Sequence, residues 1–380
     1  MQKITALLLA VLLALGAVSA LADVASDVEA GQVLTHDELL EKALAESGTF
    51  VVYGNTSRIS AAAEEFAALY NIPTESSNKK DQDIYDKLRT ENGTEAADMV
   101  MIQDSAQLTD AIAEGLVINF VPAAVKDALD EADRQPALVH QYLNKLFIYN
   151  NLGGDVPAIR NVWELTAPGM KGRVIFKNPE TEKVNMNFLV MCTSDAWAEK
   201  LAAAYEAWQG APIDLGEYRN AGYKWIAEFL DNVTFGKSDT SIAEEVSQEA
   251  AAGKIGLFVL NKLRSSSVLT DHLTVAQYDA SAGGYAVEPF SGFMYPMYAM
   301  VTAKAMRPYT AMLFIEYLMT PDGFRPWSKN IGAYSPNAAI PINEGDLGID
   351  VWKSTLVMED ASYILNSSEV EDFIRLHCQR

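Results

Sequence analysis

The chain has 380 residues, 49% of them hydrophobic, so it is long enough for two domains with their own cores and too apolar to be a disordered chain. Lysine and arginine number 29 against 51 aspartates and glutamates, which gives a net charge of −22. A protein this acidic is repelled by nucleic acid and by anionic lipid, so neither is expected as a partner.

Residues 1–22 are predicted to be a secretory signal peptide. Lys3 precedes an apolar run at 4–18, and Ala20 and Ala22 supply the small residues of a cleavage site. The run of 15 residues is shorter than the roughly 20 that a membrane-spanning helix needs. We expect cleavage after Ala22, which removes only Lys3 among the charged residues, takes the net charge from −22 to −23 and places the mature chain in the periplasm.

The chain has two cysteines and four histidines. Cys192 ends an apolar run at 188–192 and is predicted to be a buried thiol, although an oxidising compartment also permits a bridge to Cys378. The histidines are isolated from one another and from the cysteines, so no zinc-ligand spacing exists. The sequence therefore predicts no bound metal and no cofactor.

The predicted elements begin with a helix that Thr35 and Glu38 open as a capping box and that ends at Gly48. After this helix a pattern occurs four times: a strand, then a polar turn, then a helix or a further turn. The four predicted strands lie at 49–53, 97–102, 174–176 and 255–260. Such alternation predicts an α/β fold with largely parallel sheets covered on both faces. Ligands of such sheets bind beyond the carboxyl ends of the strands, where helix N-termini favour anions.

Two tracts are interpreted as crossings between two lobes. One is the strand at 146–151, which ends in Gly153-Gly154, and the other is the segment 289–293. The predicted division gives a first lobe of residues 23–146 and 290–338 and a second lobe of residues 147–289 and 339–380.

In the first lobe, polar side chains follow two predicted strands, at 49–53 and 97–102, or lie in a polar loop before a predicted helix. Hydroxyl and amide groups at such turns either bind a solute or serve as helix caps. Asp104 is also a candidate acceptor for solute hydroxyls. The candidate binding residues are Asn55, Thr56, Ser57, Arg58, Lys80, Asp81, Gln103 and Asp104.

The second lobe has a similar set of candidates. Asn185 and Asn187 begin an apolar element, Ser238, Asp239 and Thr240 precede a helix, and Tyr295 lies near the second crossing. Capping or core packing is the alternative role for each. After the strand at 255–260 come Asn261, Lys262 and Arg264, whose cationic groups suit a carboxylate or phosphate unless they lie on a solvated face.

From about Phe50 to Asn337 the chain resembles the extracytoplasmic solute-binding proteins of ABC importers, in particular the group that binds ferric ion, hexose phosphates and other small anions. The motifs that carry this resemblance are Val51-Val52-Tyr53-Gly54-Asn55-Thr56, Ala97-Asp98-Met99-Val100, Lys171-Gly172-Arg173-Val174-Ile175-Phe176-Lys177-Asn178-Pro179, Ala251-Ala252-Gly253-Lys254-Ile255-Gly256 and Gly332-Ala333-Tyr334-Ser335-Pro336-Asn337. The resemblance implies a two-lobed type II periplasmic binding protein fold with a hinge.

One departure from that group bears on the ligand. Its iron-binding members carry a Tyr-Tyr pair at the place where this chain has Asn261 to Arg264, and lysine and arginine repel a trivalent cation. The expected function is therefore a monomeric receptor that captures a small anionic solute, an organophosphate or a carboxylate, by lobe closure and delivers it to an ABC permease. The alternatives are a ferric-binding protein with another ligand set and a sensory receptor for a membrane kinase. The chain has no catalytic motif of the common hydrolase, metalloprotease or nucleotide-binding classes, so no enzyme is expected.

Overall fold

The computed structural model describes residues 24–93, 96–152, 159–276, 286–329 and 331–379. The predicted leader at 1–22 and the Gly153-Gly154 pair lie outside these ranges. The chain forms two compact units, each built from separate stretches of sequence. Unit 1 comprises Met1–Gln141, Pro296–Lys329 and Ser335–Pro341, and unit 2 comprises Tyr142–Tyr295, Asn330–Tyr334 and Ile342–Arg380.

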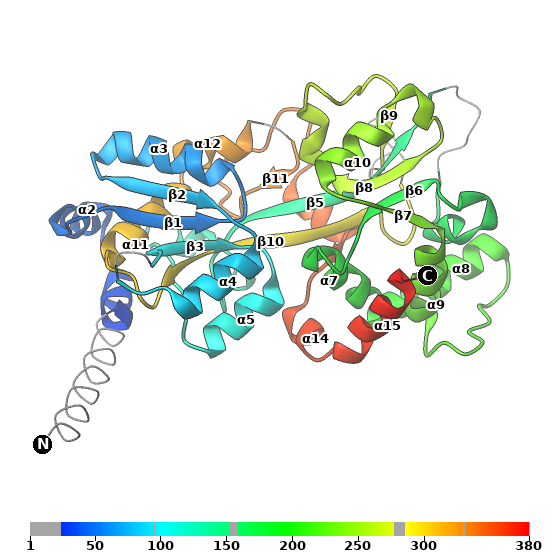
Figure 1. The fold of residues 1–380 in the computed structure, drawn as a ribbon, viewed down its shortest axis with the longest axis horizontal. Helices are drawn as coiled ribbons and strands as arrows, with labels where there is room; N and C mark the ends of the chain where they lie inside the picture. The colour runs from blue at the N-terminus through cyan, green and yellow to red at the C-terminus, as the bar shows by residue number, and fades with distance from the viewer. Residues whose placement is uncertain (1–23, 94–95, 153–158, 277–285, 330, 380) are drawn as a thin grey trace, which may run out of the picture. The chain divides into compact units, whose positions relative to one another are not determined.

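Unit 1 is built on three parallel strands in the order β2–β1–β3, followed by an antiparallel strand, β10. Figure 1 shows α3 on one side of these strands and α4 on the other. A short strand, β4, also pairs with β10. The bounds are β1 (Phe50–Gly54), β2 (Thr74–Asn78), β3 (Met99–Ile102), β4 (Val117–Ile118), β10 (Gly292–Thr302), α2 (His36–Ala45), α3 (Arg58–Tyr70), α4 (Asp81–Thr90), α5 (Ser105–Ala113), α6 (Glu131–Arg134), α11 (Pro308–Leu318) and α12 (Pro321–Ser328).

Unit 2 repeats this strand order. Its parallel strands run β7–β6–β8, and β5 joins β8 antiparallel. Three short strands join the edges of β5 and β10. The bounds are β5 (Val139–Asn150), β6 (Val174–Lys177), β7 (Val233–Gly236), β8 (Ile255–Val259), β9 (Leu273–Val275), β11 (Ala333–Tyr334), β12 (Val357–Met358), α7 (Lys183–Cys192), α8 (Asp195–Gln209), α9 (Ala221–Asn232), α10 (Asp239–Val246), α13 (Ile349–Thr355), α14 (Ala361–Leu365) and α15 (Ser368–Cys378).

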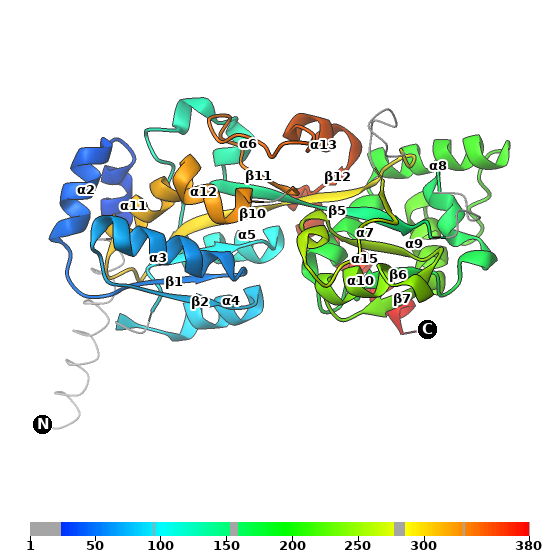
Figure 2. The same ribbon diagram turned by 90° about the horizontal axis from the view of Figure 1, so that it is seen from above.

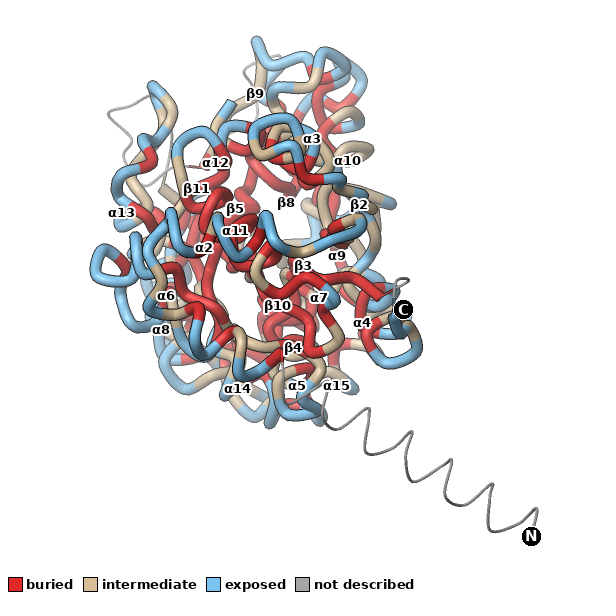
Figure 3. The backbone as a smooth tube through the Cα atoms, turned by 90° about the vertical axis from the view of Figure 1, so that its left-hand side faces the viewer, coloured by how far each residue is buried: buried red, intermediate tan, exposed pale blue. Residues whose placement is uncertain are grey.

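The local sequence accounts for most of these elements. Thr35 and Glu38 form the predicted capping box at the start of α2. The four residues of β3 are all buried, as are the five of β8, which fits strands covered on both faces. Figure 3 shows buried backbone along β3 and β10 and exposed backbone on the outer turns of α2.

The core of each unit is aromatic and aliphatic. Trp163, Trp225 and Trp327 lie in these cores and are at most 1% exposed. Cys192 is buried in α7 and Cys378 lies in α15, and both thiols are free. Among the described residues no helix combines the length and the apolar character that a bilayer crossing requires.

The shared strand order fixes where a ligand is expected in each unit. The chain runs from the central strand β1 through α3 to β2 on one side, and then through α4 to β3 on the other side of β1. The two connections therefore run in opposite directions across the sheet, and because both are right-handed they place α3 and α4 on opposite faces. The carboxyl ends of β1 and β3 therefore flank a topological switch point, where α/β sheets bind ligands. In unit 2 the same argument selects the carboxyl ends of β6 and β8, with α9 and α10 as the helices that precede β7 and β8. Figure 2 shows α10 next to β6 and β7.

Candidate functional site

In unit 1 the switch point gathers three of the predicted residues. Asn55 follows β1, Asp81 begins α4, and Gln103 follows β3. The Asn55 Nδ2 amide donates to Asp81 Oδ1 at 2.9 Å, and the Gln103 backbone N–H donates to Asp81 Oδ2 at 3.4 Å. The turns after all three parallel strands thus meet at the Asp81 carboxyl group, because parallel strands end at one edge of their sheet.

A second carboxyl group lies at the same edge. Asp104 is fully buried, and its Oδ1 accepts from the Ala106 backbone N–H at 3.1 Å as the N-cap of α5. Burial and the nearby charge of Asp104 raise the pKa of Asp81 to about 7. This edge therefore presents hydrogen-bond acceptors and a carboxyl group that is partly protonated at neutral pH.

The remaining candidates of unit 1 lie nearer to solvent. Thr56 Oγ1 accepts from the Arg58 backbone N–H at 3.3 Å, whereas the Ser57 side chain forms no cap hydrogen bond and is exposed. Lys80 is exposed at the N-cap of α4, and Arg58 is half-buried. Their roles in binding stay predictions.

In unit 2 the switch point surrounds a lysine that the sequence analysis did not select. Lys145 lies on β5, and its side chain is 1% exposed. Its Nζ donates to Asn185 Oδ1 at 2.8 Å and lies 3.2 Å from Asp239 Oδ1. The ring centroids of Phe293 and Tyr295 are each 5.9 Å from the same nitrogen, which is within cation–π range.

Asp239 and Asn185 are held in place by neighbouring backbone. Asp239 Oδ1 accepts from the Val259 N–H at the end of β8 at 3.2 Å, and Asn185 Nδ2 donates to the Lys177 carbonyl at the end of β6 at 2.8 Å. Lys177 Nζ lies 3.8 Å from Asp239 Oδ2 and forms an ion pair with Glu182. The carboxyl ends of both strands thus carry one network of two cations and two carboxylates.

The electrostatics of this network keep Asp239 ionised. Burial by itself raises the pKa of Asp239, but the charges of Lys145 and Lys177 and the hydrogen bonds outweigh burial and lower its pKa below the ordinary value. Burial lowers the pKa of Lys145, and the Asp239 carboxylate opposes that effect. We therefore regard Lys145 and Asp239 as a charged pair.

The other candidates of unit 2 have mixed surroundings. Ser238 forms a capping box with Ser241 at the start of α10, and Thr240 is half-buried in its first turn. The buried Asn187 donates to Glu359 at 3.3 Å. After β8, Asn261 is buried, Lys262 is half-buried and Arg264 is exposed.

The residues that sequence reasoning missed are Lys145, Lys177 and Glu182. Lys145 is the one lysine or arginine of β5, whose residues are all buried, and a buried ammonium needs anionic partners, so it is itself a signal. Lys177 and Glu182 lie on either side of the loop that follows a predicted strand. Ligands of α/β sheets bind at such carboxyl ends, so this position could have indicated them.

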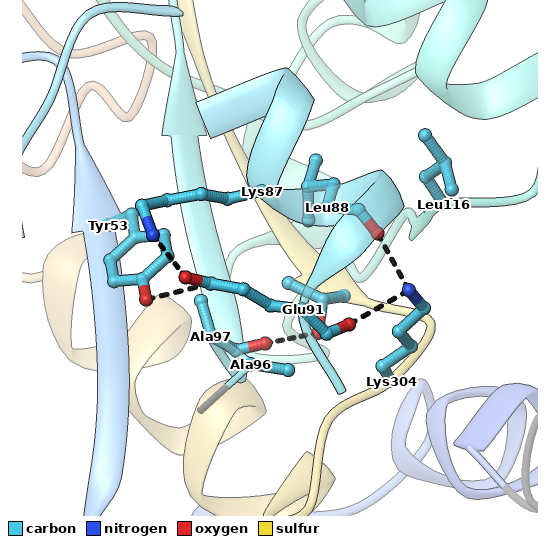
Figure 4. A pocket seen from close by; sticks show the side chains of 9 residues that line it. Tyr53, Lys87, Leu88, Glu91, Ala96, Ala97, Leu116 and Lys304 are labelled. Carbon is cyan, nitrogen blue, oxygen red and sulfur yellow. Dashed lines mark hydrogen bonds and ion pairs between the residues drawn. The ribbon is translucent and has the colours of Figure 1, made fainter. Parts of the chain in front are cut away.

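A small hollow in unit 1 has a structural role. It is lined by nine residues and has a volume of about 10 Å³, which leaves room for about one water molecule. Figure 4 shows Lys304 Nζ donating to backbone carbonyls at the end of α4, those of Leu88 at 3.0 Å and Glu91 at 2.9 Å. On the other side the Tyr53 hydroxyl donates to the Glu91 carboxylate at 2.9 Å.

Lys304 therefore acts as a C-terminal cap for α4. We expect Lys304→Met to lower the free energy of unfolding by about 1–2 kcal/mol, because the charge-assisted hydrogen bonds to the last carbonyls of the helix are lost. Urea unfolding followed by circular dichroism measures this. Lys126→Met, at an exposed position of unit 1, is the control and is expected to change little.

Among the described residues no three His, Cys, Asp or Glu side chains come together in a way that holds a metal ion. The sites in both units consist of carboxyl, amide, hydroxyl and ammonium groups. Such groups recognise a polar organic solute through hydrogen bonds and charge.

Comparison with known proteins relates this chain to a family. The family model of bacterial extracellular solute-binding proteins matches residues 50–330. No curated protein sequence matches the chain. IdiA (FutA) from Trichodesmium, in complex with iron and citrate, is 15% identical and has a TM-score of 0.63, and the match covers 88% of this chain and 100% of that one. Iron-bound HitA from Pseudomonas aeruginosa is 13% identical with a TM-score of 0.62, over 87% of this chain and 99% of that one. The periplasmic binding protein AfuA from Actinobacillus pleuropneumoniae, with fructose-6-phosphate, is 14% identical with a TM-score of 0.61, over 88% of this chain and 97% of that one.

At these identities the likeness is one of fold. It confirms the predicted α/β architecture of a two-lobed type II periplasmic binding protein.

Proposed function

Because the chain belongs to the family of bacterial extracellular solute-binding proteins, and is thus a non-enzymatic solute receptor of an ABC importer, we propose that its solute is a small anion. The predicted leader supports the periplasm as the place of capture. The permease is the expected partner, and the predicted receptor is a monomer.

The observation that carries this proposal is the buried Lys145 ammonium. It lies at the carboxyl edge of unit 2 beside Asp239, the first residue of α10, and Asn185, in the first turn of α7. Asp239 compensates the ammonium charge in the solute-free protein, but the three N–H groups of the ammonium have only two side-chain acceptors among the described residues, and helix N-termini add positive potential at the same place. An organic anion of the solute fits both features.

A thermal-shift screen of the mature protein tests the proposal. We expect carboxylates or organophosphates at millimolar concentration to raise the midpoint of unfolding, because a ligand that binds only the folded state stabilises it by mass action. Ferric salts serve as the competing arm. Stabilisation by iron alone, with a visible charge-transfer band, would contradict the proposal and support the ferric alternative.

Lobe closure is a further expectation for this fold. Binding energy that is larger in a closed conformation than in an open one shifts the population toward closure. Small-angle X-ray scattering with and without a stabilising solute is expected to show a decrease in the radius of gyration on binding. An unchanged radius at saturation would mean that binding occurs without closure.

A further inference from the structure

We propose that Lys145 contacts the solute directly and that its pairing with Asp239 selects a singly charged group, a carboxylate in preference to a dianionic phosphate. This inference rests on the proposed function and names the substrate class of the same site. It depends on the hydrogen bonds, the charges and the exposure of the network around Lys145.

The first argument concerns the hydrogen bonds of the Lys145 ammonium. The ammonium has three N–H groups, and its acceptors among the described residues are two side chains, Asn185 at 2.8 Å and Asp239 at 3.3 Å. One N–H group therefore remains for a further acceptor. The ring centroids of Phe293 and Tyr295 each lie 5.9 Å from the same nitrogen and border the ammonium.

The second argument concerns charge. In the ion pairs described, Lys145 and Lys177 face Asp239 and Glu182, so two positive charges meet two negative charges before a solute binds. The N-termini of α7 and α10 each add about half a positive charge. Together these dipoles compensate about one negative charge, whereas the second charge of a phosphate dianion would stay buried without a counter-charge.

The third argument concerns exchange of partners. The Asp239 side chain is 12% exposed and that of Lys177 is 18% exposed, so a solute meets these groups before it reaches Lys145. Lys177 already lies 3.8 Å from Asp239 Oδ2. When a solute carboxylate binds the Lys145 ammonium in place of Asp239, the Asp239 carboxylate still has Lys177 as a counter-ion. Lys177 then faces both Asp239 and Glu182, and Lys145 faces the solute.

The test uses two probes of similar shape, glycerate and glycerol phosphate, with calorimetric titration of the full mature chain at pH 8, where the phosphate monoester is a dianion because its second pKa is about 6. We expect glycerate to bind at least tenfold more tightly than the phosphate. Lys145→Met is expected to weaken glycerate binding at least tenfold. The control Lys171→Met, at an exposed turn of the same unit, is expected to bind as the wild type does.

Asp239→Asn is nearly isosteric and keeps the test decisive if Lys145→Met does not fold. Removing this carboxylate frees positive charge, so the preference for glycerate over the phosphate is expected to fall by at least tenfold. Tighter binding of the phosphate by the wild type, or an unchanged preference in Asp239→Asn, would overturn the inference while the proposed function stands. Failure of every carboxylate and phosphate to bind would overturn the proposed function and this inference together.

Discussion

Asp98→Ala is expected to destabilise unit 1 by about 3–5 kcal/mol, since it removes one partner of a buried ion pair. Asp98 is fully buried, and its Oδ2 lies 3.4 Å from the Arg307 guanidinium. Its carboxylate also accepts three backbone N–H groups, those of Val51 at 2.9 Å, Met306 at 2.7 Å and Arg307 at 3.0 Å. These bonds join the start of the sheet to the segment before α11.

Differential scanning calorimetry measures this effect. A loss of that size corresponds to a decrease of about 10 °C in the unfolding midpoint of a domain this large. Asp110→Ala, at an exposed position of α5, is the matched control and is expected to shift the midpoint little. A midpoint for Asp98→Ala within a degree of the control would show that the buried pair contributes no net stability.

Asp81 is expected to make stability decrease as the pH rises from about 4 to about 7. Burial and Asp104 raise the pKa of its carboxyl group to about 7 in the folded state, whereas an unfolded aspartate titrates near 3.9. Between these values the folded chain holds a proton that the unfolded chain has released. The stabilisation is therefore complete below pH 4 and is lost as the pH rises through 7.

The variant Asp81→Asn isolates this effect, because an amide is nearly the same size as the carboxyl group and does not titrate. We expect the difference in unfolding free energy between wild type and variant to change by about 2 kcal/mol between pH 4.5 and pH 8, with allowance for the partial exposure of Asp81. Urea titrations at the two values of pH measure it. Asp83→Asn, exposed on the same helix, should show no such change. A pH-independent difference for Asp81→Asn would mean that the carboxyl group titrates normally.

The sequence predicted the buried inner strands of each unit because their signals are local, whereas the less buried β2 and β7 were not predicted. The strands expected at 97–102, 174–176 and 255–260 overlap β3, β6 and β8. Buried parallel strands consist of continuous β-branched and apolar residues between polar turns, and neither feature depends on distant contacts. The resemblance to the binding-protein family, which set the fold class, rested on the same turns.

The site was predicted only in part because its partners are distant in sequence. Asn185 and Asp239 were selected for their places at helix starts, but Lys145, which lies 40 and 94 residues before them, was not. Nothing local marks Lys145 as a partner of either residue. Asn55 and Asp81 were both selected, yet their hydrogen bond was not foreseen for the same reason.

The interrupted connectivity of the two units has a consequence for biosynthesis. Strand β3 pairs with β10, whose residues follow the whole intervening segment of unit 2, so unit 1 is incomplete until the last quarter of the chain has left the ribosome. A nascent chain that stops earlier has an unpaired strand edge and no stable sheet. Until β10 has been synthesised the nascent chain lacks the hydrogen bonds that this strand supplies to β3, so unit 1 is expected to fold only after most of the chain has been made.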